Sequence, residues 1–109
     1  AVRIRGEEPS DGAAELMYTA VQVCLTNAIQ HANATEVSVN VWGNEYSYTV
    51  IIRNNGKPPK ENITEGGGLT NLRHRIENSG GKMTVQSLPV FSLALEIPKH
   101  GISGGNLWL

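Results

Sequence analysis

The sequence predicts an α+β fold: a two-layer α/β sandwich in which a mixed, mostly antiparallel sheet is covered on one face by helices. Segments with apolar residues at alternate positions are interrupted by two segments with helical periodicity. Short turns join neighbouring strand segments, so those pairs form hairpins. The chain has 109 residues, of which 39 % are hydrophobic, enough for one core and too few for a second domain.

The first half of the chain predicts a strand, a long helix and a hairpin. Residues 2–6 alternate apolar and charged side chains, as in a half-buried strand. Ser10 or Asp11 can cap a helix over residues 13–32, and Asn33 is a plausible stop. Strands follow at residues 36–42 and 46–53, joined by a turn. The buried stripe of the helix comprises Leu16, Met17, Ala20, Cys24 and Ala28.

The second half predicts a loop, a helix and a last pair of strands. Residues 57–68 contain two prolines and three successive glycines, which mark a loop. A helix over residues 69–79 has Leu69, Leu72 and Ile76 on its inner face. The remaining strands are expected at residues 82–87 and 90–97. We expect the folded domain to comprise residues 1–98 and residues 99–109 to be a tail without a clear fold signal.

Composition excludes several classes of function. Nine Lys and Arg residues against ten Asp and Glu give a net charge of −1, so no broad surface for nucleic acid is expected. Cys24 is the only cysteine, which rules out an internal disulfide and a cysteine zinc cluster, and it is expected in the core. No apolar run is long enough to span a membrane, and no signal peptide follows Ala1. We therefore expect a cytoplasmic domain without membrane contact, excised from a larger protein.

Two features of the sequence point to a ligand. Asn27 and His31 are polar residues in an otherwise apolar helix, so they are exposed, satisfied by protein partners, or available to a ligand. Three glycines at residues 66–68 directly precede a helix, where free N–H groups and the helix dipole favour phosphate. A plain flexible loop is the alternative. The pattern is neither a Walker loop nor a dinucleotide-binding fingerprint.

The combination of motifs is more specific than either feature. Asn27-Ala28-x-x-His31-Ala32 is followed by Asn54-Asn55-Gly56, then by Gly66-x-Gly68-Leu69-x-Asn71-Leu72-x-x-Arg75 and Gly80-Gly81. In this order and spacing the chain resembles the ATP-binding domain of sensor histidine kinases. That domain belongs to the GHKL superfamily with the Bergerat-type ATP-binding fold, shared with DNA gyrase and MutL. The subfamily of nitrate sensors and a membrane-fluidity thermosensor is the most similar.

The resemblance implies ATP and Mg²⁺ as ligands. By position, Asn27 would be the Mg²⁺ ligand, Asn54 would accept a hydrogen bond from the adenine amino group, and Gly56 would let the backbone pass close to the base. Residues 57–65 would form a lid. The implied nucleotide-binding set is Asn27, Gln30, His31, Asn54, Gly56, Gly66, Gly68, Leu69 and Thr70.

The sequence departs from the family pattern at four places. Val23 stands where the family has an acid that positions or activates the attacking group, so no catalytic residue is assigned. Gln30 replaces a phosphate-binding cation. Asn54 replaces the adenine-binding aspartate, and its uncharged amide weakens that hydrogen bond. The threonine expected before the last strand is missing around residues 89–92.

Two functions remain open from the sequence. In the first, the chain binds Mg-ATP for phosphoryl transfer to a histidine on the dimerisation helices of a parent kinase, which then signals to a response regulator. None of His31, His74 and His100 lies in a phosphoacceptor sequence. In the second, the chain is a degenerate, inactive member of the fold that acts as a regulatory module. A serine kinase of the anti-sigma-factor type is a third possibility, which the helix around Arg73 and Arg75 fits less well.

Overall fold

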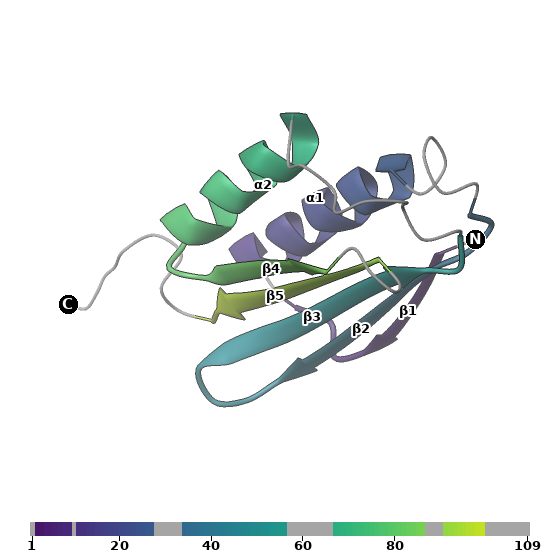
Figure 1. The fold of residues 1–109 in the computed structure, drawn as a ribbon. Coiled ribbons are helices and arrows are strands. Elements are labelled where there is room, and N and C mark those ends of the chain that lie inside the picture. Colours follow the sequence, from purple (N-terminus) through teal and green to yellow (C-terminus); the bar gives the residue numbers. More distant parts are fainter. Residues whose placement is uncertain (1, 10, 28–33, 57–66, 87–90, 100–109) are drawn as a thin grey trace.

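The computed structural model describes residues 2–9, 11–27, 34–56, 67–86 and 91–99. All seven predicted helices and strands are found among them, in the predicted order (Figure 1). The elements are β1 (Val2–Gly6), α1 (Asp11–Asn27), β2 (Val37–Gly43), β3 (Ser47–Asn54), α2 (Gly67–Asn78), β4 (Lys82–Gln86) and β5 (Ser92–Pro98).

The strands form one mixed sheet in the order β1-β2-β3-β5-β4. Strands β1 and β2 are parallel, and the pairs β2–β3, β3–β5 and β4–β5 are antiparallel. A parallel pair cannot be joined by a tight turn, and α1 provides the connection between β1 and β2. The predicted mixed, mostly antiparallel sheet is therefore confirmed.

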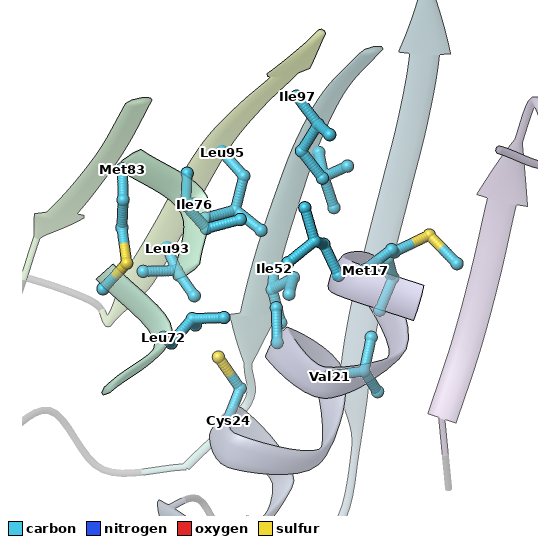
Figure 2. Close-up of a cluster of buried hydrophobic side chains, with 14 of the residues drawn as sticks. Met17, Val21, Cys24, Ile52, Leu72, Ile76, Met83, Leu93, Leu95 and Ile97 are labelled. Carbon is cyan, nitrogen blue, oxygen red and sulfur yellow. The ribbon is translucent and has the colours of Figure 1, made fainter. Parts of the chain in front are cut away.

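Both helices pack on the same face of the sheet, as predicted (Figure 1). Each inner strand presents every second side chain to this face, and the helices present their apolar stripes. Figure 2 shows Met17, Val21 and Cys24 of α1 beside Ile52, and Leu72 and Ile76 of α2 among side chains of β4 and β5. The least exposed members of this core include Ala20, Val39, Val50, Ile52, Ile76, Leu93 and Ile97.

The prediction of a half-buried first strand is wrong. All five residues of β1 are exposed, and its apolar side chains Val2 and Ile4 are 38 % and 47 % exposed. The register pairs Val2 with Val37 and Ile4 with Val39, so these side chains do lie on the helix-covered face. However, β1 is an edge strand, and the described part of α1 packs over the neighbouring strands.

The second helix begins earlier than predicted. It starts at Gly67, so Gly67 and Gly68 form its first turn instead of ending the loop. The expected end of the first helix, with Ala28 and the stop at Asn33, lies outside the described residues. Lys99, the first residue of the expected tail, donates its N–H to the Tyr46 carbonyl and places its ammonium 4.8 Å from the Tyr48 ring centroid.

A glycine is required where β1 leaves the sheet. Gly6 has φ = 102°, a conformation that side chains disfavour, and a Cβ atom there would collide with the Val41 carbonyl oxygen. The same carbonyl accepts a hydrogen bond from the Glu7 N–H at 3.0 Å. This turn directs the chain from β1 into α1.

Neither of the helices that the structure describes is long and apolar enough to cross a membrane.

Candidate functional site

Three segments that carry predicted ligand-binding residues meet at one end of the sandwich. Helix α1 returns from the end of β1 to the start of the parallel strand β2, so it runs in the same direction as β3. Helix α2 follows β3 in the chain and runs back to the start of β4. The end of α1, the end of β3 and the start of α2 therefore lie at the same end, on the right of Figure 1.

The two helices touch where α2 begins. A Cβ atom added to Gly68 would lie 3.3 Å from Cγ1 and 3.6 Å from Cγ2 of Val23, so only a glycine allows this approach without displacement. Asn27 lies one helical turn after Val23, on the same side of α1. It is half-buried, and its side chain has no hydrogen bond to another described residue. Asn27 thus lies one helical turn from the residue that contacts the start of α2.

The first turn of α2 can bind an anion. The first four N–H groups of a helix have no acceptor within the helix, and the dipole makes this end positive. No acidic side chain in this turn competes for the N–H groups. Gly68 is exposed, Thr70 is half-buried, and the Leu69 side chain is 3 % exposed and belongs to the core. Leu69 can therefore contact a ligand through its backbone only.

The end of β3 presents an amide to the same region. Asn54 continues the alternation of Val50 and Ile52, so its side chain lies on the helix-covered face. Its Oδ1 accepts a hydrogen bond from the Gly56 N–H at 2.8 Å. An amide oxygen has two lone pairs, so it can accept one further hydrogen bond. Gly56 is half-buried, and its turn is held by this bond.

The adjacent residue, Asn55, has a structural role that the sequence analysis did not assign. Its Oδ1 accepts hydrogen bonds from the N–H groups of Thr35 and Glu36, both at 3.0 Å, and its Nδ2 donates to Thr35 Oγ1 at 3.0 Å. Its own N–H donates to the Glu36 carbonyl at 3.1 Å. Asn55 therefore ties the end of β3 to the segment before β2. Successive residues of an extended strand point to opposite faces of the sheet, so Asn54 and Asn55 have different surroundings. The alternation in the sequence predicts this difference.

A polar contact also joins the helices at their other end. Arg75 of α2 donates to Glu15 Oε1 of α1 at 3.0 Å and to Thr19 Oγ1 at 3.3 Å. Arg73 donates to the Met83 carbonyl of β4 at 2.8 Å. Arg75 thus connects α2 to α1, and Arg73 connects it to β4. His74, between these two arginines, is exposed.

Sequence comparisons relate the chain to sensor kinases. Sensor histidine kinase YxjM of Bacillus subtilis is 30 % identical over 83 residues, which cover 76 % of this chain and 20 % of that protein. The histidine-protein kinase/phosphatase UhpB of Salmonella typhimurium is 26 % identical over 85 residues, 77 % of this chain and 17 % of that protein. The chain thus spans about a fifth of the length of these relatives. No family model matches the chain.

Solved structures give the same answer for the fold. The histidine kinase domain of the Erythrobacter litoralis blue-light activated kinase EL346 superposes with a TM-score of 0.66, 20 % identity and coverage of 96 % of this chain and 56 % of that chain. The ATP binding domain of PrrB from Mycobacterium tuberculosis has a TM-score of 0.63, 20 % identity and coverage of 89 % and 79 %. The chain has the fold of a histidine kinase ATP-binding domain.

Few described residues of the candidate site could hold a metal ion. No group of three or more His, Cys, Asp or Glu side chains that could hold a metal occurs in the described ranges. Mg²⁺ in phosphate sites takes one or two protein oxygens, with phosphate oxygens and waters as further ligands. The Asn27 amide oxygen suits such a site. Gln30, His31, Gly66 and the expected lid at residues 57–65 lie outside the described residues.

Cys24 is a core residue, as predicted. It is 2 % exposed and lies on α1 near Leu72 of α2 (Figure 2). Burial raises the pKa of its thiol from 9.0 to about 12, because the thiolate would lose its hydration. A neutral thiol is a weak nucleophile. Cys24 therefore takes no part in the site, although it lies one residue from Val23.

Proposed function

We propose that this chain is the ATP-binding domain of a two-component sensor histidine kinase and binds Mg-ATP. The observation that carries the proposal is the contact between Gly68 and Val23, which holds the glycine-rich start of α2 one helical turn from Asn27. An anion site and a candidate Mg²⁺ ligand are thereby adjacent. The glycine pattern also favours the nitrate-sensor and thermosensor subfamily within the kinases.

Each residue of the site has a specific task in this proposal. The N–H groups of Gly68 and Leu69 bind phosphate oxygens at the positive end of α2. The amide oxygen of Asn27 would hold Mg²⁺, which would supply positive charge beside the phosphates. The Asn54 oxygen accepts a hydrogen bond from the adenine amino group while it holds Gly56. Gln30, His31, Gly66 and Thr70 complete the proposed set.

The acceptor histidine in this proposal belongs to the dimerisation helices of a parent kinase. That parent passes the phosphoryl group to a response regulator, and this domain lies in the cytoplasm. Val23 cannot act as a base or bind a water, so the domain contributes positioning and electrostatic stabilisation only.

A degenerate, regulatory member of the fold is the second candidate function. The structure shows the specific reason to consider it: the side chain of Val23 fills the space against Gly68 with methyl groups. This apolar contact stabilises the packing of α1 on α2. It also leaves the position of Val23 without a group that can accept or donate a proton. Such a domain keeps the fold and its contacts with the parent while phosphoryl transfer is lost.

Titration calorimetry with ATP, in the presence and absence of Mg²⁺, tests nucleotide binding. We expect micromolar binding that depends on Mg²⁺, and loss of that binding in Asn27→Ala because the metal loses its protein ligand. Asn78→Ala is the matched control, since Asn78 is an exposed asparagine at the opposite end of the helical layer. Its affinity should equal that of the unmodified chain.

The outcome separates the two candidate functions. Binding that needs Mg²⁺ and Asn27 supports the kinase domain, and phosphoryl transfer within the parent protein is then the next assay. Absence of binding up to millimolar ATP contradicts it and favours the regulatory module. Equal loss in both asparagine variants would indicate a general effect on folding and would contradict the assignment of Asn27 as a ligand.

A further inference from the structure

The face of the sheet away from the helices carries a groove. No described element covers this face (Figure 1). A groove of about 280 Å³ on it is lined by residues from three adjacent strands: Arg5 of β1, Asn40 and Trp42 of β2, and Ile51 and Arg53 of β3. It is separated by the thickness of the sheet from the helices and lies apart from the proposed nucleotide site.

Two cations of this groove have no partner in the described structure. Arg3, the neighbour of Arg5 on the same face, pairs with Glu36 at 3.6 Å. Arg5 and Arg53 are exposed and form no hydrogen bond or ion pair with any described residue. Their strands are separated by β2, so the two backbones lie roughly 10 Å apart across the sheet. The Asn40 side chain, paired in register with Arg5, lies between them.

The groove also offers apolar surface. Trp42 is 52 % exposed, although large aromatic side chains are usually covered. Ile51 is half-buried on the next strand and pairs in register with Asn40. Tryptophan and arginine are enriched among the residues that dominate protein interfaces, because both bury a large area and provide directional polar contacts.

We propose that this groove binds an acidic peptide segment of a partner protein, in which carboxylates alternate with apolar residues. Carboxylates of the segment pair with Arg5 and Arg53, since guanidinium groups bind carboxylates through two parallel hydrogen bonds. Apolar side chains of the segment pack on Trp42 and Ile51. Asn40 provides a hydrogen bond to the peptide backbone between them.

Other occupants fit the groove less well. A second copy of the chain related by a two-fold axis would set these arginines against one another. A single-stranded nucleic acid needs several stacking aromatic residues, whereas Trp42 is the one aromatic side chain among the described residues that line the groove. The chain also has a net charge of −1. Charge and shape therefore favour a short acidic segment.

The test is NMR titration of the 109-residue chain with a peptide of alternating Glu and Leu, observing backbone amides and the Trp42 indole N–H. We expect saturable shifts confined to β1, β2 and β3 around the groove. Arg53→Glu and Arg5→Glu should each weaken binding at least tenfold. Lys82→Glu is the matched control: Lys82 is exposed on the same sheet face, on β4, and the charge change is the same. Its affinity should stay within twofold.

Defined results would overturn the proposal. These are absence of saturable binding, shifts confined to the helices, or equal weakening by Lys82→Glu, which would show that net charge alone governs binding. Tighter binding of a short oligothymidylate than of the peptide would assign the groove to nucleic acid. If a peptide with Gln in place of each Glu bound with unchanged affinity, the arginines would have no role in binding. ATP affinity should not change in any of these variants.

Discussion

At the scale of single residues, two adjacent asparagines at the end of β3 have different roles. Asn55 makes three side-chain hydrogen bonds to Thr35 and Glu36, so both lone pairs of its Oδ1 are used within the protein. Asn54 makes one, to the Gly56 N–H, and retains a lone pair on the helix-covered side. The same side-chain chemistry thus supports the structure at one position and leaves an acceptor for a ligand at the next.

Asn54→Asp should tighten ATP binding about fivefold, because a charged acceptor strengthens a hydrogen bond by about 1 kcal/mol. The carboxylate can still accept from the Gly56 N–H, so the turn is retained. Calorimetric titration of the variant measures the effect. Asn55→Asp is the control: it loses the Nδ2 donor to Thr35, so it should lower stability without tightening ATP binding. Equal affinity of Asn54→Asp and the unmodified chain would contradict the adenine assignment.

Cys24 makes stability depend on pH. Its pKa is about 12 in the folded chain and 9.0 in an exposed thiol, so above pH 9.0 the unfolded state loses the proton that the folded state keeps. The free energy of unfolding should therefore fall as the pH rises from 9.0 toward 12. Urea unfolding of the chain and of Cys24→Ala, on both sides of pH 9.0, isolates this contribution. An identical pH dependence for both proteins would show that Cys24 is not the cause.

At the scale of elements, the site depends on how closely α2 approaches α1. The approach is set by the missing side chain at Gly68 and the methyl groups of Val23, while Arg75 and Glu15 connect the same helices further along. The exposed ion pair stabilises this arrangement by at most about 1 kcal/mol. The close apolar contact therefore determines where the first turn of α2 lies.

The Gly68–Val23 contact predicts a measurable coupling. Gly68→Ala raises the helix propensity at this position, which stabilises the helix by up to about 1 kcal/mol. It also places a methyl group 3.3 Å from Cγ1 of Val23, which opposes this gain. The single substitution should change the free energy of unfolding by less than about 1 kcal/mol. In a Val23→Ala background the contact is relieved, so Gly68→Ala should be more favourable by at least about 0.5 kcal/mol. Val21→Ala, on another side of α1, should give additive effects, and additivity with Val23→Ala as well would contradict the contact.

Hydrophobic periodicity predicts the type and position of the helices and strands well, and the burial of their side chains less well. The alternation of Val37, Val39 and Val41 fixed both the strand and its buried face, and the structure confirms them. Residues 2–6 show similar alternation, yet β1 is exposed on both faces, because burial depends on where the helices pack and periodicity does not contain that information. Gly67 and Gly68 were expected in a loop, since glycine is a poor helix former, but packing against α1 includes them in the helix.

For the whole molecule, the topology brings together the residues of the candidate site from separate segments. The parallel connection through α1 and the antiparallel pairing of β2 with β3 bring Asn27, Asn54 and Gly68 to one end of the sandwich. Motif order predicts these residues as ligands but contains no geometry. The directions of the strands determine that they meet at one end. Hydrogen bonds such as those of Asn55 depend on local geometry and could not be read from motif order.

The order of strands also predicts how stability is distributed. Strand β3 is paired on both sides and covered by α1, whereas β1 has one neighbour and five exposed residues. The other edge strand, β4, is covered by α2 through the buried side chain of Met83. Amide hydrogen exchange of hydrogen-bonded positions should therefore be slowest in β3, intermediate in β4 and fastest in β1, since local opening is easiest where little apolar surface is buried. Exchange in β1 as slow as in β3 would contradict this order and would mean that the edge of β1 is covered in solution.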